Sequence, residues 1–231
     1  MPRVFIGVGH GGPDPGAVAN GLKESYVNLT MAKACKDYLE AHGVTVGISR
    51  LTDESDTLSQ EIAECKAFKP DIAIEIHNNA GGGDGFECYT NQSAASIKLA
   101  GLLETQVKAI GQNSRGLKYN AGLGWTKQTG CVVLCEGFFL DSNDRFIADT
   151  AAKQQAFGVA YAKAILSYLG ITDQPIAGKL GIWSEQKQRV VYVDFMEKAG
   201  NNYIKLRDFP AIVPGVSVEW SSSRKMPVVK W

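Results

Sequence analysis

The chain contains three histidines, and two of them adjoin short apolar runs that have the character of buried strands. His10 follows the run of residues 3–9, in GVGHGGPDPGA, and His77 ends the run of residues 71–77, in IEIHNNA. Alone, His10 is as compatible with a turn residue as with a ligand, and His77 is more typical of a core position than of a ligand. If both runs are strands of an open α/β sheet, their carboxyl ends border one crevice. Two imidazoles that face one crevice predict a metal site, because imidazole is the commonest metal ligand in proteins and suits zinc.

A catalytic zinc site needs three protein ligands and one open position, so a third ligand must come from a carboxylate or a thiolate. Glu24 stands between the glycine-rich loop and a predicted helix, in GLKESYVNL. It is the best candidate, although it could equally be a carboxylate at a helix N-terminus. Glu75 is the rival ligand, because it lies two residues before His77 on the same strand face. His42 precedes Gly43 at the end of an amphipathic helix, where a structural role with the helix dipole is expected.

Glu136 is a lone carboxylate inside an apolar strand, CVVLCEGFF. Such a group is costly unless it is paired or functional, so a structural ion pair is one interpretation. The other is catalytic: a glutamate near a zinc-activated water can act as general base and pass the proton to the leaving amine. Strand alternation places Glu136 on one face with Val132 and Leu134.

Strands that alternate with helices predict an α/β fold that positions these residues. We expect a mixed β-sheet flanked by helices, and a small β-rich C-terminal domain. Strands are predicted at residues 3–9, 44–50, 71–77, 85–91 and 131–139. Helices are predicted at residues 25–42, with Ser25 as the cap, and at residues 57–68, 94–111 and 144–169, with a glycine-punctuated stretch over 116–130.

The pattern changes after DQPIAGK, residues 173–179, which has the Pro and Gly of a linker. We therefore predict a catalytic domain over residues 1–173 and a small module over residues 180–231, where short β-like runs replace the alternating pattern. Three of the four tryptophans, Trp183, Trp220 and Trp231, fall in this module. They could stack on sugars, or fill a core too small to stand without large aromatics.

Composition excludes some classes of function. Acidic and basic residues balance at 24 each, whereas a nucleic-acid binder or an anionic-lipid anchor needs a basic excess. No run of about 18 apolar residues predicts a membrane span, so no membrane insertion is expected. The five cysteines have irregular spacing and no CxxC pair, so we predict small buried hydrophobic residues and not a zinc knuckle.

Four blocks of the sequence resemble the zinc-dependent N-acetylmuramoyl-L-alanine amidases of type 3, which include bacterial autolysins and phage endolysins. In chain order the blocks are GHGGPDPGA, GLKE, IEIHNNA and VVLCEGFFLDSNDR, within residues 3–170. The resemblance implies that His10, Glu24 and His77 hold the metal and that Glu136 is the catalytic glutamate. It favours Glu24 over Glu75. The EGFF variant is similar to clostridial phage endolysins. One departure is that Ser142 stands where the family usually has Asn.

The resemblance implies hydrolysis of the amide between N-acetylmuramic acid and L-alanine in peptidoglycan, with Zn²⁺ as cofactor. A zinc peptidase acting on the stem peptide and a non-catalytic wall-binding protein are the alternatives. The C-terminal module resembles small repeats of Gram-positive surface proteins, which implies wall binding or assembly. MPRVFIGVGHGG is too short for a secretory signal, so we expect synthesis in the cytoplasm and action on the wall after phage-type membrane permeabilisation.

Overall fold

The computed structural model describes residues 1–173, 179–184, 189–198, 201–204, 217–221 and 226–230. The chain divides into two compact units, Met1–Asp173 and Gln174–Trp231, and each is described by itself. Among the described residues, no helix is long and apolar enough to cross a membrane.

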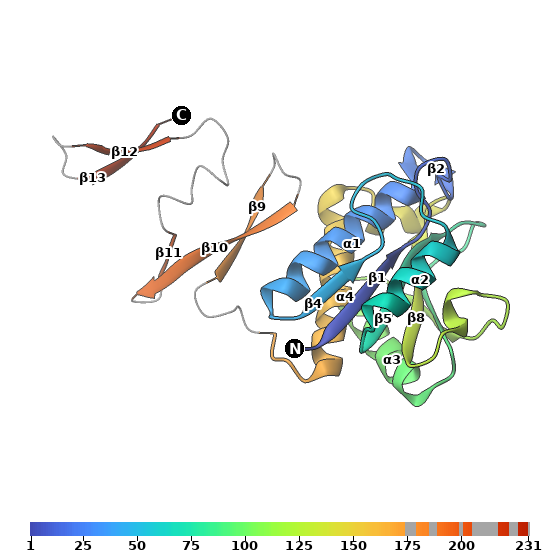
Figure 1. Ribbon diagram of the computed structural model, residues 1–231. Helices are drawn as coiled ribbons and strands as arrows, with labels where there is room; N and C mark the ends of the chain where they lie inside the picture. The colour runs from blue at the N-terminus through green and yellow to red at the C-terminus, as the bar shows by residue number, and fades with distance from the viewer. Residues whose placement is uncertain (174–178, 185–188, 199–200, 205–216, 222–225, 231) are drawn as a thin grey trace. The chain divides into compact units, whose positions relative to one another are not determined.

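A six-stranded sheet forms the centre of the first unit, in the order β4-β1-β5-β8-β6-β7 (Figure 1). Its strands are β1 (Arg3–Val8), β4 (Thr45–Ile48), β5 (Ile72–Asn79), β6 (Phe86–Thr90), β7 (Ser114–Lys118) and β8 (Cys131–Phe139). The first four in spatial order are parallel, whereas β6 pairs antiparallel with β8 and parallel with β7. The predicted mixed sheet is therefore confirmed.

Helices cover the sheet on both faces. They are α1 (Glu24–Ala41), α2 (Leu58–Phe68), α3 (Ala94–Ala109) and α4 (Ala151–Leu169), with short 3-10 turns η1 (Trp125–Lys127) and η2 (Asn143–Ile147). The larger core lies where α1, α3 and α4 pack on one face, and strand alternation sends Ile72, Ile74 and Ile76 of β5 into it. The opposite face packs Phe5, Val132 and Leu134 against Trp125 and α2.

Most element boundaries agree with the sequence predictions to within two residues, and three differ. Ser25 is not the cap of α1: the helix begins at Glu24, and its cap position Lys23 makes no side-chain capping bond. The predicted helix over 144–169 is a 3-10 turn and a separate helix, because the chain leaves helical geometry before Thr150 caps α4. Strand β7 (Ser114–Lys118), partly inside the glycine-punctuated stretch, was missed because SRGLK lacks an apolar alternation.

All five cysteines are free and buried, as predicted. Cys35 lies on α1 and Cys65 on α2, while Cys88, Cys131 and Cys135 lie on β6 and β8. Burial raises the pKa of the Cys65 thiol to about 12. These thiols therefore act as small apolar side chains in the two cores.

Gly158 fixes how closely α4 approaches α1. A Cβ built there would lie 2.1 Å from the Met31 carbonyl oxygen and 2.8 Å from the Ala34 Cβ. We expect Gly158→Ala to lower the free energy of unfolding by about 1–3 kcal/mol, because the two helices must separate. Gly101→Ala on α3 is the matched control, since nothing lies within 4 Å of that site. It should stabilise by up to about 1 kcal/mol through helix propensity.

Denaturant unfolding of the two glycine variants measures this difference. A Gly158→Ala midpoint at or above that of Gly101→Ala would show that the helices accommodate a methyl group without separating.

The second unit consists of strands in the part that the structure describes. An antiparallel group contains β9 (Lys179–Ser184), β10 (Arg189–Lys198) and β11 (Asn201–Ile204), and a hairpin contains β12 (Ser217–Ser221) and β13 (Met226–Lys230). Trp183 lies on β9 and Trp220 on β12, whereas Trp231 lies outside the described residues. The wall-binding or assembly role of this unit stays a prediction, which comparing insoluble-wall binding by the full chain and by residues 1–173 would test.

Candidate active site

Three elements bring the predicted metal ligands together at the carboxyl edge of the parallel strands. His10 follows β1, and His77 lies on the neighbouring strand β5. Glu24 is the first residue of α1, and the small hairpin of β2 (Val18–Ala19) and β3 (Leu22–Lys23) returns the chain to this edge. One donor atom from each of the three residues can be chosen so that all lie within 4.8 Å of one another.

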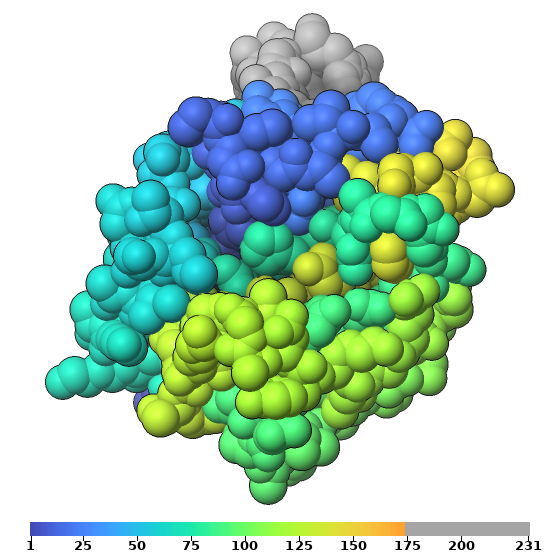
Figure 2. Space-filling model, turned by 90° about the vertical axis from the view of Figure 1, so that its right-hand side faces the viewer, coloured from blue at the N-terminus to red at the C-terminus, as the bar shows by residue number. Residues whose placement is uncertain are grey.

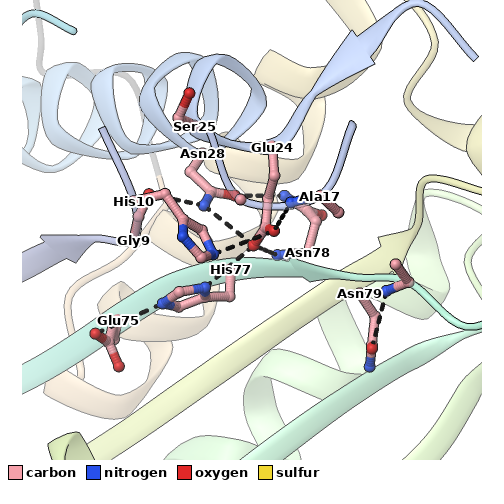
Figure 3. A network of polar contacts seen from close by, with 12 residues as sticks. Gly9, His10, Ala17, Glu24, Ser25, Asn28, Glu75, His77, Asn78 and Asn79 are labelled. Atoms are coloured by element: carbon pink, nitrogen blue, oxygen red, sulfur yellow. Dashed lines mark hydrogen bonds and ion pairs between the residues drawn. The ribbon is translucent and has the colours of Figure 1, made fainter. Parts of the chain in front are cut away.

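The Glu24 carboxylate lies between the two imidazoles (Figure 3). Its Oε2 is 3.2 Å from His10 Nε2, and its Oε1 is 3.1 Å from His77 Nδ1. Two imidazole nitrogens and a carboxylate oxygen are a common donor set for catalytic zinc. Ligands about 2.0–2.2 Å from a tetrahedral ion lie about 3.3–3.6 Å apart, so these two separations are within a few tenths of an ångström of those that such an ion requires.

Backbone amides hold Glu24 in place. Ala17 N donates to its Oε2 at 2.9 Å, and Asn78 N donates to its Oε1 at 3.0 Å. On the other side, His10 Nδ1 lies 2.9 Å from the Asp14 carboxylate, which fixes the ring so that Nε2 faces Glu24. Both side chains are therefore oriented by groups that do not belong to the cluster.

Two glycines leave the space in which the imidazoles lie. A Cβ at Gly9 would be 2.2 Å from the ring of His77, and a Cβ at Gly16 would be 2.6 Å from both His10 and Glu24. His10 itself has a φ of 62°, which side chains other than glycine seldom adopt. The loop is thus strained at the residue that presents a candidate ligand, as is common at functional sites.

Arg50 ties this loop to the sheet and to α1. Its guanidinium is almost fully buried and donates to the carbonyl oxygens of Val8, Gly9 and Ser25 at 2.8–3.1 Å. A buried cation whose donors are used in this way fixes three segments at once.

The electrostatics of the cluster favour positive charge. The hydrogen bond to Glu24 raises the pKa of His10. Burial opposes protonation of His77, but its contacts with Glu24 and Glu75 outweigh burial and raise its pKa. Burial also acts to raise the pKa of Glu24, yet the two histidines hold it well below its usual range. An anionic carboxylate between two imidazoles is the charge arrangement that a divalent cation completes.

Glu136 lies beside this cluster on the same sheet face. It is the register partner of His77 across β5 and β8. Its Oε2 is buried without a hydrogen-bond partner among the described residues. Burial raises the pKa of Glu136 to about 7. The expected face shared with Leu134 is confirmed, because both residues line one pocket with His10 and His77.

The pocket has a volume of about 260 Å³ and opens to solvent. Figure 2 shows the hollow between the blue N-terminal residues, the cyan segment that includes Asp56 and Leu58, and the yellow-green segment that includes Leu123 and Trp125. A substrate amide that enters it can reach the side chains of His10, His77 and Glu136.

Comparison with known proteins identifies the family. Residues 4–167 match the family Amidase_3, described as N-acetylmuramoyl-L-alanine amidase. The chain belongs to this family. The resemblance of the four sequence blocks is thereby confirmed, and the protein is an amidase that hydrolyses an amide bond in peptidoglycan.

Individual relatives agree with this assignment. The N-acetylmuramoyl-L-alanine amidase CwlM of Bacillus licheniformis is 31% identical over 184 residues, which are 77% of this chain and 72% of that protein. An endolysin of Bacillus phage SPP1 is 34% identical over 152 residues, 61% of this chain and 56% of the endolysin. The catalytic domain of CwlV, an amidase from Bacillus (Paenibacillus) polymyxa var. colistinus, has a TM-score of 0.69 at 27% identity, covering 74% of this chain and 100% of that domain.

The rival ligand Glu75 lies on the far side of His77 in this amidase. Its Oε1 is 3.6 Å from His77 Nε2, whereas Glu24 faces Nδ1. Glu75 also contacts the buried Glu61 of α2, whose pKa is raised to about 8 by burial and by the Glu75 charge. Glu61 accepts hydrogen bonds from Val8 N and Ser49 Oγ. Glu75 is therefore placed behind the imidazole ring and outside the His10–Glu24–His77 cluster.

His42 lies at the other end of α1 from Glu24, about 27 Å along an 18-residue helix at roughly 1.5 Å per residue. Its Nδ1 is 2.8 Å from the Tyr38 carbonyl oxygen, and its ring stacks on Tyr38. These contacts agree with the predicted structural role.

Ser142, which departs from the family pattern, starts the turn η2. It donates to the Gly83 carbonyl oxygen at 2.7 Å and accepts from Asp144 N at 3.1 Å. Asp144 in turn accepts from Gly85 N and Phe139 N. The serine therefore stabilises the loop after β8 without entering the cluster.

Sequence reasoning missed several residues that shape the site. Asp14 could have been found, since it lies four residues after His10 in the same loop. Glu61 lies four residues before the buried Cys65 on α2, a spacing that indicates an inward carboxylate. Arg50 could not have been found, because it ends a predicted strand with no distinctive motif and its hydrogen bonds go to carbonyl groups that are distant in the sequence.

Proposed function

We propose that this amidase cuts the amide between the lactyl group of N-acetylmuramic acid and L-alanine, with zinc held by His10 Nε2, Glu24 and His77 Nδ1. The observation that carries the proposal is the buried, unpartnered oxygen of Glu136 beside a two-histidine, one-carboxylate cluster in an open pocket. Zinc, when bound, supplies Lewis acidity that polarises a carbonyl and makes a neighbouring water more acidic.

Glu136 supplies the proton transfers in this proposal. Its carboxylate, which lines the pocket beside His77, accepts a proton from the attacking water. It then donates that proton to the nitrogen of the departing L-alanine, so the amine leaves neutral and the carboxylate is restored. Burial raises the pKa of Glu136, whereas a bound cation lowers it, and these opposing effects keep both protonation states of the carboxyl group accessible to a general acid–base group.

Glu24 and its neighbours hold the geometry. The backbone amides of Ala17 and Asn78 donate hydrogen bonds to the Glu24 carboxylate, and the Asp14 carboxylate contacts His10 Nδ1. Glu24 and His10 are therefore fixed before substrate binds. Such positioning lowers the barrier because little reorganisation is needed during the reaction.

Digestion of purified cell walls tests the proposed function. We expect new amino groups that belong to L-alanine, together with intact sugar strands that carry free lactyl carboxylates in mass spectra. New amino groups on later stem residues would identify a peptidase instead. Binding to walls without release of amino groups would identify a non-catalytic wall-binding protein.

The likeness to an endolysin supports the expected delivery to the wall after membrane permeabilisation. Lysis of expressing cells with and without a membrane-permeabilising partner would test it. Equal lysis without the partner would contradict it.

A further inference from the structure

The catalytic face of the sheet continues beyond Glu136 to a buried carboxylate on the next strand. Glu87 of β6 is the register partner of Glu136, as Glu136 is of His77. The three side chains therefore form one row across β5, β8 and β6, on the face that bears the pocket. The side chain of Glu87 is 6% exposed, so its charge requires a partner.

That partner is Arg115 on the edge strand β7. Its Nε donates to Glu87 Oε1, while Tyr89 Oη donates to Glu87 Oε2 at 3.1 Å. The guanidinium also lies over the ring of Phe139, 5.3 Å from the ring centroid. The Nε edge and one flat face of the group are thus occupied, which fixes its orientation.

The terminal nitrogens of Arg115 remain available. They donate no hydrogen bond to the described residues, and 45% of the side chain is exposed. A guanidinium fixed at Nε, with its other donors directed to solvent, is prepared for paired hydrogen bonds to a carboxylate.

The pocket beside Arg115 contains many carboxylic side chains, so Arg115 is a rare partner for an anionic group of a substrate. Five carboxylic residues and no Lys or Arg line the pocket: Asp14, Asp56, Glu61, Glu75 and Glu136. An anionic group of a substrate finds no Lys or Arg partner there. Arg115 offers it a partner immediately past Glu87, on the side away from the metal cluster.

We propose that Arg115 binds a carboxylate of the peptide stem, on the leaving-group side of the cleaved amide. The inference rests on the proposed function. Register partners in an antiparallel pair have Cα atoms about 4.5–5.5 Å apart, and the Arg115 guanidinium contacts Glu87, the register partner of Glu136. An extended peptide advances about 3.3 Å per residue and neighbouring strands lie about 4.8 Å apart, so a carboxylate on the second stem residue is within one or two residue lengths of an amide held at Glu136.

Two soluble substrates test the proposal. Both are N-acetylmuramoyl peptides that begin with L-alanine, and they differ only in whether the second residue carries a free carboxylate or the corresponding carboxamide. Wild-type enzyme should prefer the carboxylate. Arg115→Gln should raise KM for the carboxylate substrate roughly 10- to 100-fold, leave its kcat nearly unchanged, and have little effect on the carboxamide.

Lys118→Ala is the matched control, because Lys118 is a cation on the same strand without a contact to Glu87. It should change neither KM. Arg115→Lys keeps the charge but loses the paired donors, so it should retain part of the preference. If Arg115→Gln does not fold, as its thermal unfolding would show, the Arg115→Lys comparison decides alone.

The outcomes separate this inference from the proposed function. Equal loss on both substrates in Arg115→Gln, or in Arg115→Lys if that variant decides, would make the arginine a structural partner of Glu87 and overturn the inference. Equal wild-type KM values would also overturn it. Wild-type enzyme that leaves the lactyl–alanine bond of both substrates intact would contradict the proposed function itself.

Discussion

Glu136→Gln should lower turnover by at least about 10²–10⁴-fold, the usual contribution of a positioned acid–base group. The substitution keeps the side-chain volume and removes the basicity. Metal content should stay unchanged, because Glu136 lies outside the His10–Glu24–His77 cluster. Substrate affinity should also persist. Steady-state rates on a soluble muropeptide, with zinc measured on the same sample, give the comparison. Glu104→Gln, on the far helix α3, should retain normal rates.

The pH profile gives a second measure of the same group. A general base must be deprotonated, so activity rises as pH increases through the pKa of Glu136. Burial raises that pKa to about 7 in the metal-free protein, and a bound cation nearby lowers it. The acidic limb of the wild-type profile should therefore fall at or below pH 7 and be absent from the residual activity of Glu136→Gln. Near-normal turnover in this variant would assign the base to another group such as Glu75, and loss of zinc would make Glu136 a ligand.

Removing any one of the three predicted ligands should nearly abolish both zinc binding and activity. Each of the variants His10→Ala, Glu24→Ala and His77→Ala leaves only two donors. Loss of a residue that merely supports a ligand lowers metal affinity by up to about 100-fold, so loss of a ligand itself should lower zinc affinity by more than that. Elemental analysis should find about one zinc per wild-type chain, and a chelator should abolish hydrolysis. His42→Ala is the control, since His42 lies at the other end of α1. Full zinc occupancy in His77→Ala would contradict the assignment.

The strands that carry His77 and Glu136 could be predicted from the sequence because each is a nearly continuous apolar run. Such runs are typical of central parallel strands, and a single carboxylate or imidazole inside them stands out. Glu24 needed more than pattern: spacing alone left a helix-terminus role and the rival Glu75 open. The structure shows that backbone amides from residues 17 and 78 fix its carboxylate, which no local pattern indicates.

The wrong predictions have physical causes. Ser25 has the residue type of a cap, but Glu24 already has helical geometry and its carboxylate is used by distant amides. The apolar residues after position 144 have helical spacing, so the sequence does not indicate the break before α4. In the structure, the Asp144 carboxylate accepts hydrogen bonds from the amides of Gly85 and Phe139, which holds residues 143–147 in a separate turn. The pairing of Glu87 with Arg115 joins strands separated by α3, so it requires the sheet order itself.

The reversal of strand direction between β8 and β6 brings the first residues of β6 and β7 to the edge of the sheet at which β1, β5 and β8 end. His10, His77 and Glu136 belong to the carboxyl halves or following loops of β1, β5 and β8, whereas Glu87 and Arg115 are each the second residue of their strand. The segments at residues 80–85 and 110–113 therefore border the proposed stem-binding side without contributing to the metal cluster. Loops are the parts of a fold that most readily change length. A change of length at residues 110–113, which connect α3 to β7, would therefore alter the proposed stem-binding side without replacing a proposed metal ligand.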